Sequence, residues 1–134
     1  MDPKHATILV VEDEELVRDV MRKTLEGDGY TVLEARDRDE ALQVCTTRQQ
    51  NAETVELMIC DVFMPGMGIR GFAQRTAIAQ PGMRSLYVSA CTIEEFVSQV
   101  TYLTGAAFMT KPFNPVELLA GVHSLLGEAD SATA

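Results

Sequence analysis

Five polar side chains that follow short apolar segments are of types that together support phosphoryl chemistry. Glu12 and Asp13 follow one apolar segment and Asp61 follows another, while Ser89 and Lys111 lie at the ends of two more. Clustered carboxylates repel one another unless a cation lies between them, and oxygen ligands favour a hard ion such as Mg²⁺. A carboxylate can also attack a phosphoryl donor to form an acyl phosphate. Asp61 is the candidate for that attack.

The remaining groups would assist such a transfer. A bound metal and the ammonium of Lys111 would neutralise charge on the transferring group, and Ser89 would donate a hydrogen bond to the new phosphoryl oxygens. Each residue alone has a plainer interpretation. Ser89 is compatible with the cap of a turn and Lys111 with a surface lysine. The acidic run Glu12–Glu15 also suits a helix start, because the macrodipole favours acids there.

A parallel sheet would bring these five groups to one place. Short apolar or β-branched segments alternate with stretches of helical periodicity, which predicts strands joined by helices. Right-handed crossovers then give a doubly wound α/β fold with both faces of the sheet covered. Ligands in such folds bind beyond the carboxyl ends of the strands, where the five groups fall. The predicted strands are Thr7–Val11, Thr31–Ala35, Val55–Cys60, Arg84–Ser89 and Ala107–Thr110.

Five helices are predicted, and the first two have recognisable ends. The first should end near Gly27 and Gly29. The second should open at Asp37, with Glu40 three residues on completing a capping-box pattern. The side chains predicted to point inward are Val17, Val20, Met21 and Leu25 in the first helix, and Ala41, Leu42 and Cys45 in the second.

The last three helices differ in the strength of their signals. The third is predicted at Gly71–Ala79, before Pro81. Thr92 and Glu95 form a capping-box pattern that opens the fourth, with Phe96, Val97 and Val100 inward. The fifth has the best start signal: Asn114 caps, Pro115 takes the first helical position and Glu117 the third. Its apolar face carries Leu118, Leu119, Val122, Leu125 and Leu126, and residues from Gly127 onward should fray.

Composition favours one soluble domain without a nucleic-acid face. The 134 residues are 46% hydrophobic and carry a net charge of −9, which suits a single domain spanning residues 1–134 with a core of about 6–127. Nucleic-acid binding requires clustered Lys and Arg, so it is not expected. Cys45, Cys60 and Cys91 are too widely spaced for a metal motif and are predicted to be buried thiols. No signal peptide or membrane-spanning run is evident, and a cytoplasmic location is expected.

From Thr7 to Leu126 the chain resembles the receiver domain of bacterial two-component response regulators. The resemblance rests on several short motifs, which are weak singly and specific in this order. They are the opening Ile8–Glu14, Asp61 followed by Met64-Pro65-Gly66-Met67, Ser89-Ala90, and the closing Gly105–Phe108 with Lys111-Pro112-Phe113. The amino-acid sequence of the closing motifs is similar to that of receivers attached to hybrid sensor histidine kinases.

This resemblance implies a role for each matching position. Asp61 is the implied phosphoacceptor, and its donor is a histidine on a histidine kinase or a histidine phosphotransfer protein. Glu12, Asp13 and Asp61, with the backbone carbonyl of Phe63, are the implied ligands of Mg²⁺ or Mn²⁺. Lys111 would pair with phosphoryl oxygens, and its bond to Pro112 is cis in relatives. Ser89 and Phe108 occupy the two switch positions.

The resemblance also implies a fold and an output surface. The fold is the flavodoxin-like three-layer sandwich with strand order 2-1-3-4-5. The output surface is the fourth helix, fifth strand and fifth helix, about residues 92–126, and a homodimer through that face is left open. One stretch departs from the family pattern, because a glycine expected soon after Met67 is displaced to Gly71. This departure predicts a longer or differently folded loop over Gly68–Gly71.

Three other functions fit the sequence less well. A phosphatase of the haloacid-dehalogenase type would place a second carboxylate two residues after the nucleophile, where this chain has Phe63. A flavodoxin-type module would have a phosphate loop rich in Ser, Thr and Gly where this chain has Glu12–Glu15. A degenerate receiver, used only for docking, would not need all five key side chains. On the favoured interpretation the chain is not an enzyme beyond promoting its own phosphorylation and dephosphorylation.

Overall fold

Five parallel strands form one sheet in the order β2-β1-β3-β4-β5, in a computed structural model that describes residues 6–90 and 106–133. This is the predicted doubly wound α/β fold with the flavodoxin-like order. Four strands have the predicted bounds. The third begins two residues later than predicted, because the amide of Val55 donates to the side chain of Gln80 instead of to a strand, and it ends one residue later, at Asp61. The strands are β1 Thr7–Val11, β2 Thr31–Ala35, β3 Leu57–Asp61, β4 Arg84–Ser89 and β5 Ala107–Thr110.

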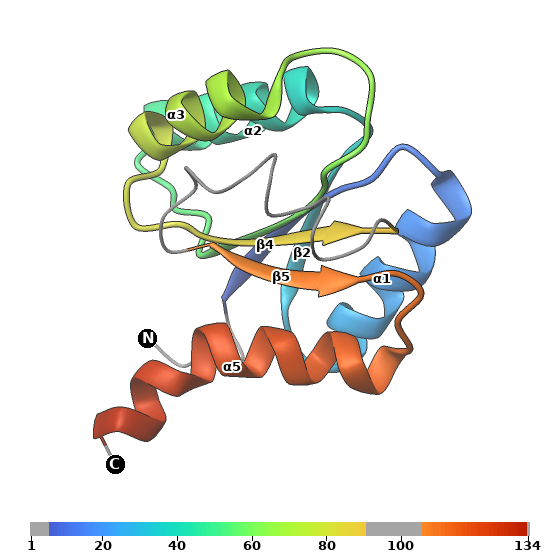
Figure 1. The fold of residues 1–134 in the computed structure, drawn as a ribbon. Helices are drawn as coiled ribbons and strands as arrows, with labels where there is room; N and C mark the ends of the chain where they lie inside the picture. Colours follow the sequence, from blue (N-terminus) through green and yellow to red (C-terminus); the bar gives the residue numbers. More distant parts are fainter. Residues whose placement is uncertain (1–5, 91–105, 134) are drawn as a thin grey trace.

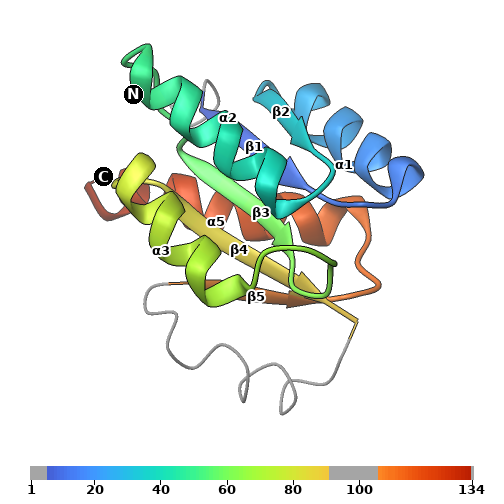
Figure 2. The same cartoon turned by 90° about the horizontal axis from the view of Figure 1, so that it is seen from above.

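Helices cover both faces of the sheet (Figures 1 and 2). Helices α2 (Arg38–Gln50) and α3 (Ile69–Ala79) lie on one face, and α1 (Glu15–Gly27) and α5 (Pro115–Thr133) lie on the other. The predicted fourth helix, with Thr92, Glu95, Phe96, Val97 and Val100, lies outside the described residues, as does Cys91. No helix in the described parts of the chain is both long and apolar enough to cross a bilayer.

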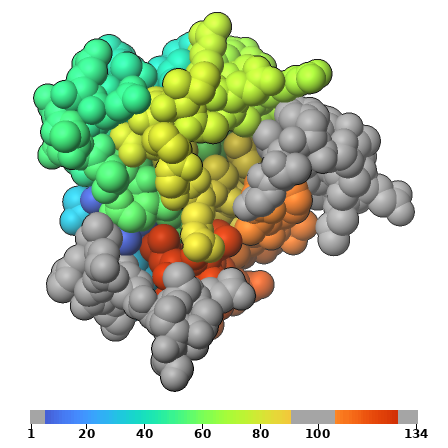
Figure 3. Space-filling model, turned by 90° about the vertical axis from the view of Figure 1, so that its left-hand side faces the viewer, coloured from blue at the N-terminus to red at the C-terminus, as the bar shows by residue number. Residues whose placement is uncertain are grey.

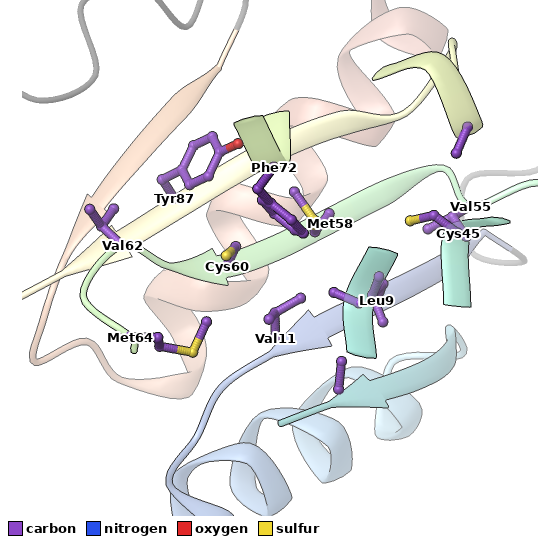
Figure 4. Packing of buried hydrophobic residues seen from close by; sticks show 13 residues of the cluster. Leu9, Val11, Cys45, Val55, Met58, Cys60, Val62, Met64, Phe72 and Tyr87 are labelled. Atoms are coloured by element: carbon purple, nitrogen blue, oxygen red, sulfur yellow. The ribbon is translucent and has the colours of Figure 1, made fainter. Parts of the chain in front are cut away.

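Alternate residues of the central strands enter two separate cores. Leu9 and Val11 of β1 pack towards α2 and α3 with Met58, Cys60 and Tyr87 (Figure 4). The intervening strand residues pack towards α1 and α5: Ile8, Val10, Ile59, Leu86 and Val88. Because both faces are covered, β1 and β3 are continuous buried runs rather than alternating ones. Each fully buried aliphatic side chain contributes about 1.5–3 kcal/mol relative to exposure.

Two predicted helix caps are confirmed by hydrogen bonds. The Asp37 Oδ1 atom accepts from the Glu40 amide at 2.8 Å. The Asn114 Oδ1 atom accepts from the Glu117 amide at 2.8 Å, and Glu117 Oε1 accepts from the Asn114 amide at 3.1 Å. The second pair is a complete capping box. Both caps fix where the chain turns from a strand end into a helix.

Three predictions about the helices are wrong. Helix α3 begins at Ile69 with Gly68 as its N-cap, so Gly71 lies inside the helix and does not lengthen the preceding loop. Helix α5 continues to Thr133 instead of fraying from Gly127, since the segment beyond that glycine contains helix formers such as Ala and Glu. The side chain of Val20 is 57% exposed, because it lies about 100° around the helix from buried Met21.

The Gln80 side chain joins three backbone groups near the amino end of β3. It is buried, its Oε1 accepts from the Val55 amide at 3.0 Å, and its Nε2 donates to the carbonyls of Cys45 and Glu53, both at 3.1 Å. It thus ties the end of α3 to α2 and to the entry of β3. Figure 3 faces this side of the molecule, where the green surface after α2 adjoins the yellow surface after α3.

Replacing Gln80 by Met should therefore destabilise the domain out of proportion to its change in volume. The three backbone groups would lose their buried partner, at a cost of roughly 2–3 kcal/mol in the free energy of unfolding. Urea denaturation measures this loss. Gln74→Met, on the exposed face of the same helix, should change stability by less than about 0.5 kcal/mol. Equal effects of the two substitutions would contradict the assignment.

Candidate functional site

The register of the sheet brings the five predicted side chains to its carboxyl edge. Val11 is paired with Cys60, so Glu12 and Asp61 follow side by side at the ends of β1 and β3. Ser89 is paired with Thr110 at the ends of β4 and β5, and Lys111 comes next. The groups are therefore neighbours in space although up to 99 residues separate them in the chain.

The ammonium of Lys111 lies between two carboxylates from different strands. Its Nζ atom is 2.7 Å from Asp61 Oδ2, and 3.1 and 3.2 Å from the two carboxylate oxygens of Glu12. The side chains of Glu12, Asp61 and Lys111 are 1%, 11% and 20% exposed. Screening by solvent is weak at such exposure, so these contacts are stronger than surface ion pairs.

Backbone hydrogen bonds hold the same residues in place. The Glu12 amide donates to the carbonyl of Ala35 at 3.1 Å, and the Glu12 carbonyl accepts from Arg18 Nη1 at 2.8 Å. The Lys111 amide donates to the carbonyl of Ser89 at 2.8 Å. The Phe63 amide donates to Asp61 Oδ1 at 2.9 Å. Each oxygen of the Asp61 carboxylate thus has its own donor.

Burial and charge change the protonation of this cluster. Burial, opposed by Lys111 and reinforced by Asp61, raises the pKa of Glu12 to about 7. Burial disfavours the charged form of Lys111, but the hydrogen bonds and charges of Asp61 and Glu12 outweigh it and raise the pKa of that ammonium. The site therefore keeps its cation, while its most buried carboxyl group exchanges a proton near neutral pH.

Glu12, Asp13 and Asp61 form a group of oxygen ligands that suits a divalent cation. One ligand atom from each residue lies within 4.8 Å of those of the other two. Asp13 is exposed while the other two are buried, so the group has a solvent side. Three carboxylates and one ammonium carry a net charge of −2 when all are ionised. A hard, oxygen-binding ion would balance that charge.

The remaining predicted site residues differ in burial. Ser89 is fully buried, whereas the rings of Phe63 and Phe108 are 48% and 47% exposed. The peptide bond between Lys111 and Pro112 is cis. Of the predicted output surface, the part corresponding to the fourth helix lies outside the described residues, and β5 and α5 lie within them.

The two described thiols are inert in their environments. Cys45 and Cys60 are free and buried, as predicted. Burial raises the pKa of Cys60 to about 12 and that of Cys45 to about 11. Because the thiolate is the reactive form, neither residue is a candidate nucleophile beside Asp61.

One residue close to the site is not among the sequence predictions. Arg38 is 4% exposed and its guanidinium donates to backbone carbonyls of the segment that follows Asp61. The sequence does carry a weak signal for it, since a cation in the first turn of a helix opposes the macrodipole. A cation in this unfavourable position indicates that its side chain makes compensating contacts elsewhere.

Comparisons with known proteins agree with this geometry. The family model of the response regulator receiver domain matches residues 8–123. The chain is 32% identical to the transcriptional regulatory protein YvrH of Bacillus subtilis (strain 168), over 92% of this chain and 50% of that protein. It is 30% identical to the sensor kinase CckA of Brucella abortus (strain 2308), over 93% of this chain and 13% of that protein.

A solved structure shows the same fold. The receiver domain protein (CheY-like) from Methanospirillum hungatei JF-1 superposes with a TM-score of 0.81 at 26% identity, covering 96% of this chain and 98% of that one. The chain spans half or less of the two curated relatives above, so the likeness concerns the matched domain. All five side chains at the carboxyl edge fall within the residues that the family model matches. The chain belongs to the response regulator receiver domain family of two-component signalling.

Proposed function

We propose that this receiver domain takes a phosphoryl group from a phosphohistidine onto Asp61, with Mg²⁺ or Mn²⁺ held by Glu12, Asp13, Asp61 and the carbonyl of Phe63. The observation that carries this proposal is the contact of 2.7 Å between Lys111 Nζ and Asp61 Oδ2, beside a group of three carboxylates. A receiver built only for docking would not need this arrangement. The same cluster would be costly to keep without a function, because it places like charges together at a buried edge.

The proposed transfer forms one bond at Asp61 and breaks one bond in the donor. A bond forms between a carboxylate oxygen of Asp61 and phosphorus, and the bond between phosphorus and the donor histidine nitrogen breaks, with the electron pair remaining on that nitrogen. Lys111 already donates to Asp61, so a small shift would direct it to the phosphoryl oxygens. The divalent ion, when bound, supplies positive charge against those oxygens.

The product would change the shape of one face of the domain. Ser89 is buried at the end of β4 beside the site, and we propose that its hydroxyl turns to the phosphoryl oxygens. Phe108, on β5 and 47% exposed, would then move inward. The surface altered would be the one containing β5 and α5, together with the predicted fourth helix.

The proposed partners follow from this chemistry. A histidine kinase or histidine phosphotransfer protein would supply the phosphoryl group. This donor would be either a separate protein or another domain of a longer protein that contains the receiver. The net charge of −9 disfavours direct contact with nucleic acid. We further propose a single domain over residues 1–134, a cytoplasmic location, and no catalysis beyond its own phosphorylation and dephosphorylation. A homodimer through the β5 and α5 face is a secondary proposal.

The acceptor is tested with Mg²⁺, a small phosphodonor and intact mass measurement. The wild-type chain should gain the mass of one phosphoryl group, and Asp61→Asn should gain none, because the amide is a poor nucleophile. Asp19→Asn, at an aspartate on α1 paired with Arg22 and Lys23, should gain the group as the wild type does. No gain by the wild type under saturating donor would favour the docking-only alternative.

The charge balance of the site is tested by the pH dependence of stability. A carboxyl group whose pKa is raised on folding stabilises the fold below its unfolded pKa, and this contribution is lost as pH rises through the folded pKa. For Glu12, with a pKa of about 7, the metal-free protein should lose roughly 2 kcal/mol between pH 5 and pH 7.5. Chemical denaturation with a chelator present measures this.

Two comparisons isolate the contribution of Glu12. The variant Glu12→Gln should lose the slope, since its amide does not titrate. Added Mg²⁺ should stabilise the wild type more at pH 7.5 than at pH 5, because metal and proton compete for the same carboxylate. Identical pH profiles for wild type and variant in chelator would contradict the proposed protonation of Glu12.

A further inference from the structure

Arg38 is a buried cation without a carboxylate partner. It is the first residue of α2 and only 4% exposed, and no ion pair within residues 6–90 and 106–133 includes it. Burying a charged group is costly unless it is paired and hydrogen-bonded. Its position at the positive end of a helix adds to that cost. The hydrogen bonds of the guanidinium must therefore compensate.

The hydrogen bonds from this guanidinium to backbone carbonyls all go to one loop. Nη1 donates to the carbonyls of Met64 and Met67, at 3.1 and 2.8 Å, and Nη2 donates to the carbonyl of Val62. The three acceptors belong to the segment 62–68, which connects β3 to α3. Nε has no partner. The planar fork of an arginine suits several acceptors at fixed angles, so the loop and the side chain hold each other.

One of these bonds reaches the Asp61 carboxylate through a single peptide unit. The carbonyl of Val62 accepts from Arg38, and the amide of Phe63 in the same unit donates to Asp61 Oδ1 at 2.9 Å. The six atoms of a peptide unit are coplanar. Fixing the carbonyl end therefore fixes the direction of the N–H that orients Asp61.

The next peptide unit carries the proposed metal ligand. The carbonyl of Phe63 lies between the carbonyls of Val62 and Met64, which Arg38 holds. The loop also lies close to the start of α2 at Gly66, where an added Cβ would be only 3.3 Å from Asp39 Oδ2. The φ of +106° at this glycine is a conformation that other residues rarely adopt. The loop thus has little freedom to turn the Phe63 carbonyl away.

We propose that Arg38 is a positioning residue for the phosphoryl and metal site, acting through the loop 62–68 on the Asp61 carboxylate and the Phe63 carbonyl. This inference rests on the proposed function of the site and adds a residue from α2 to it. It also explains the cation in the first turn of that helix. In this proposal Arg38 is a ligand of neither the metal nor the phosphoryl group.

The test is the affinity for Mg²⁺ alone, measured by titration calorimetry on the whole chain. Replacing Arg38 by Met keeps much of the apolar volume and removes all the donors. We expect the dissociation constant to rise about 10- to 100-fold, which is typical when a residue that orients metal ligands is lost. Arg38→Lys keeps the charge but not the fork, and should lie between wild type and Arg38→Met.

The matched control is Arg48→Met at the other end of the same helix. Arg48 also donates to a backbone carbonyl, that of Thr54 at 2.9 Å, and its Nε is likewise buried without a partner. It should lose stability without changing the dissociation constant by more than about twofold. Hydrogen exchange of the segment 62–68 gives a second measure, and it should quicken in the Arg38 variants and stay unchanged in Arg48→Met.

The outcomes separate this inference from the proposed function. If the wild type binds no Mg²⁺, the proposed function itself fails. If the wild type binds but Arg38→Met and Arg38→Lys bind equally well, only the inference about Arg38 is overturned. An equal loss in Arg48→Met would also overturn it, since the effect would then be general destabilisation. If Arg38→Met does not fold, the affinity and exchange of Arg38→Lys decide.

Discussion

The ammonium of Lys111 between Asp61 and Glu12 is the interaction on which the rest of the site depends. It joins the end of β5 to the ends of β3 and β1, and it lies where solvent screens it little. Its geometry requires the observed register of all these strands, because a shift of one residue would send each side chain to the opposite face of the sheet. The two separate cores set that register by burying alternate residues of each strand.

The protein's own groups do not balance the charge of the cluster. The three carboxylates exceed the one ammonium, and the most buried carboxyl group, Glu12, holds its proton to about neutral pH. A divalent ion would take the place of that proton, and a phosphoryl group would then meet an ammonium and a metal instead of bare carboxylates. Each donor to Asp61 comes from a different part of the fold: Lys111 from the end of β5, and the Phe63 amide from a loop braced by α2.

Sequence reasoning predicted the parts of this structure that follow from local patterns. Short apolar runs predicted the strands. Asp37 and Asn114 predicted two helix starts, where their side-chain oxygens accept backbone hydrogen bonds. The five candidate site residues could be placed together because each lies at the end of a strand or just after it, and parallel strands end at one edge. Several short motifs, found in the same order as in receiver domains, then indicated the family.

The sequence could not reveal features that depend on distant contacts. The first-turn position of Arg38 is only a weak signal, and its three carbonyl acceptors lie 24 to 29 residues away in the chain. The predicted start of α3 is two residues too late, because glycine is compatible both with a loop and with a first helical turn. The raised pKa of Glu12 arises from burial and from a lysine 99 residues away, and neither is visible in a local motif.

Chemical mapping of the phosphorylated residue tests the central claim most directly. After reaction with Mg²⁺ and a phosphodonor, borohydride reduces an acyl phosphate on aspartate to homoserine, and peptide sequencing by mass locates it. The proposed site predicts homoserine at position 61 and nowhere else in the chain. Homoserine at Asp13 or at another aspartate, or phosphate recovered only on hydroxyl or imidazole side chains, would contradict it.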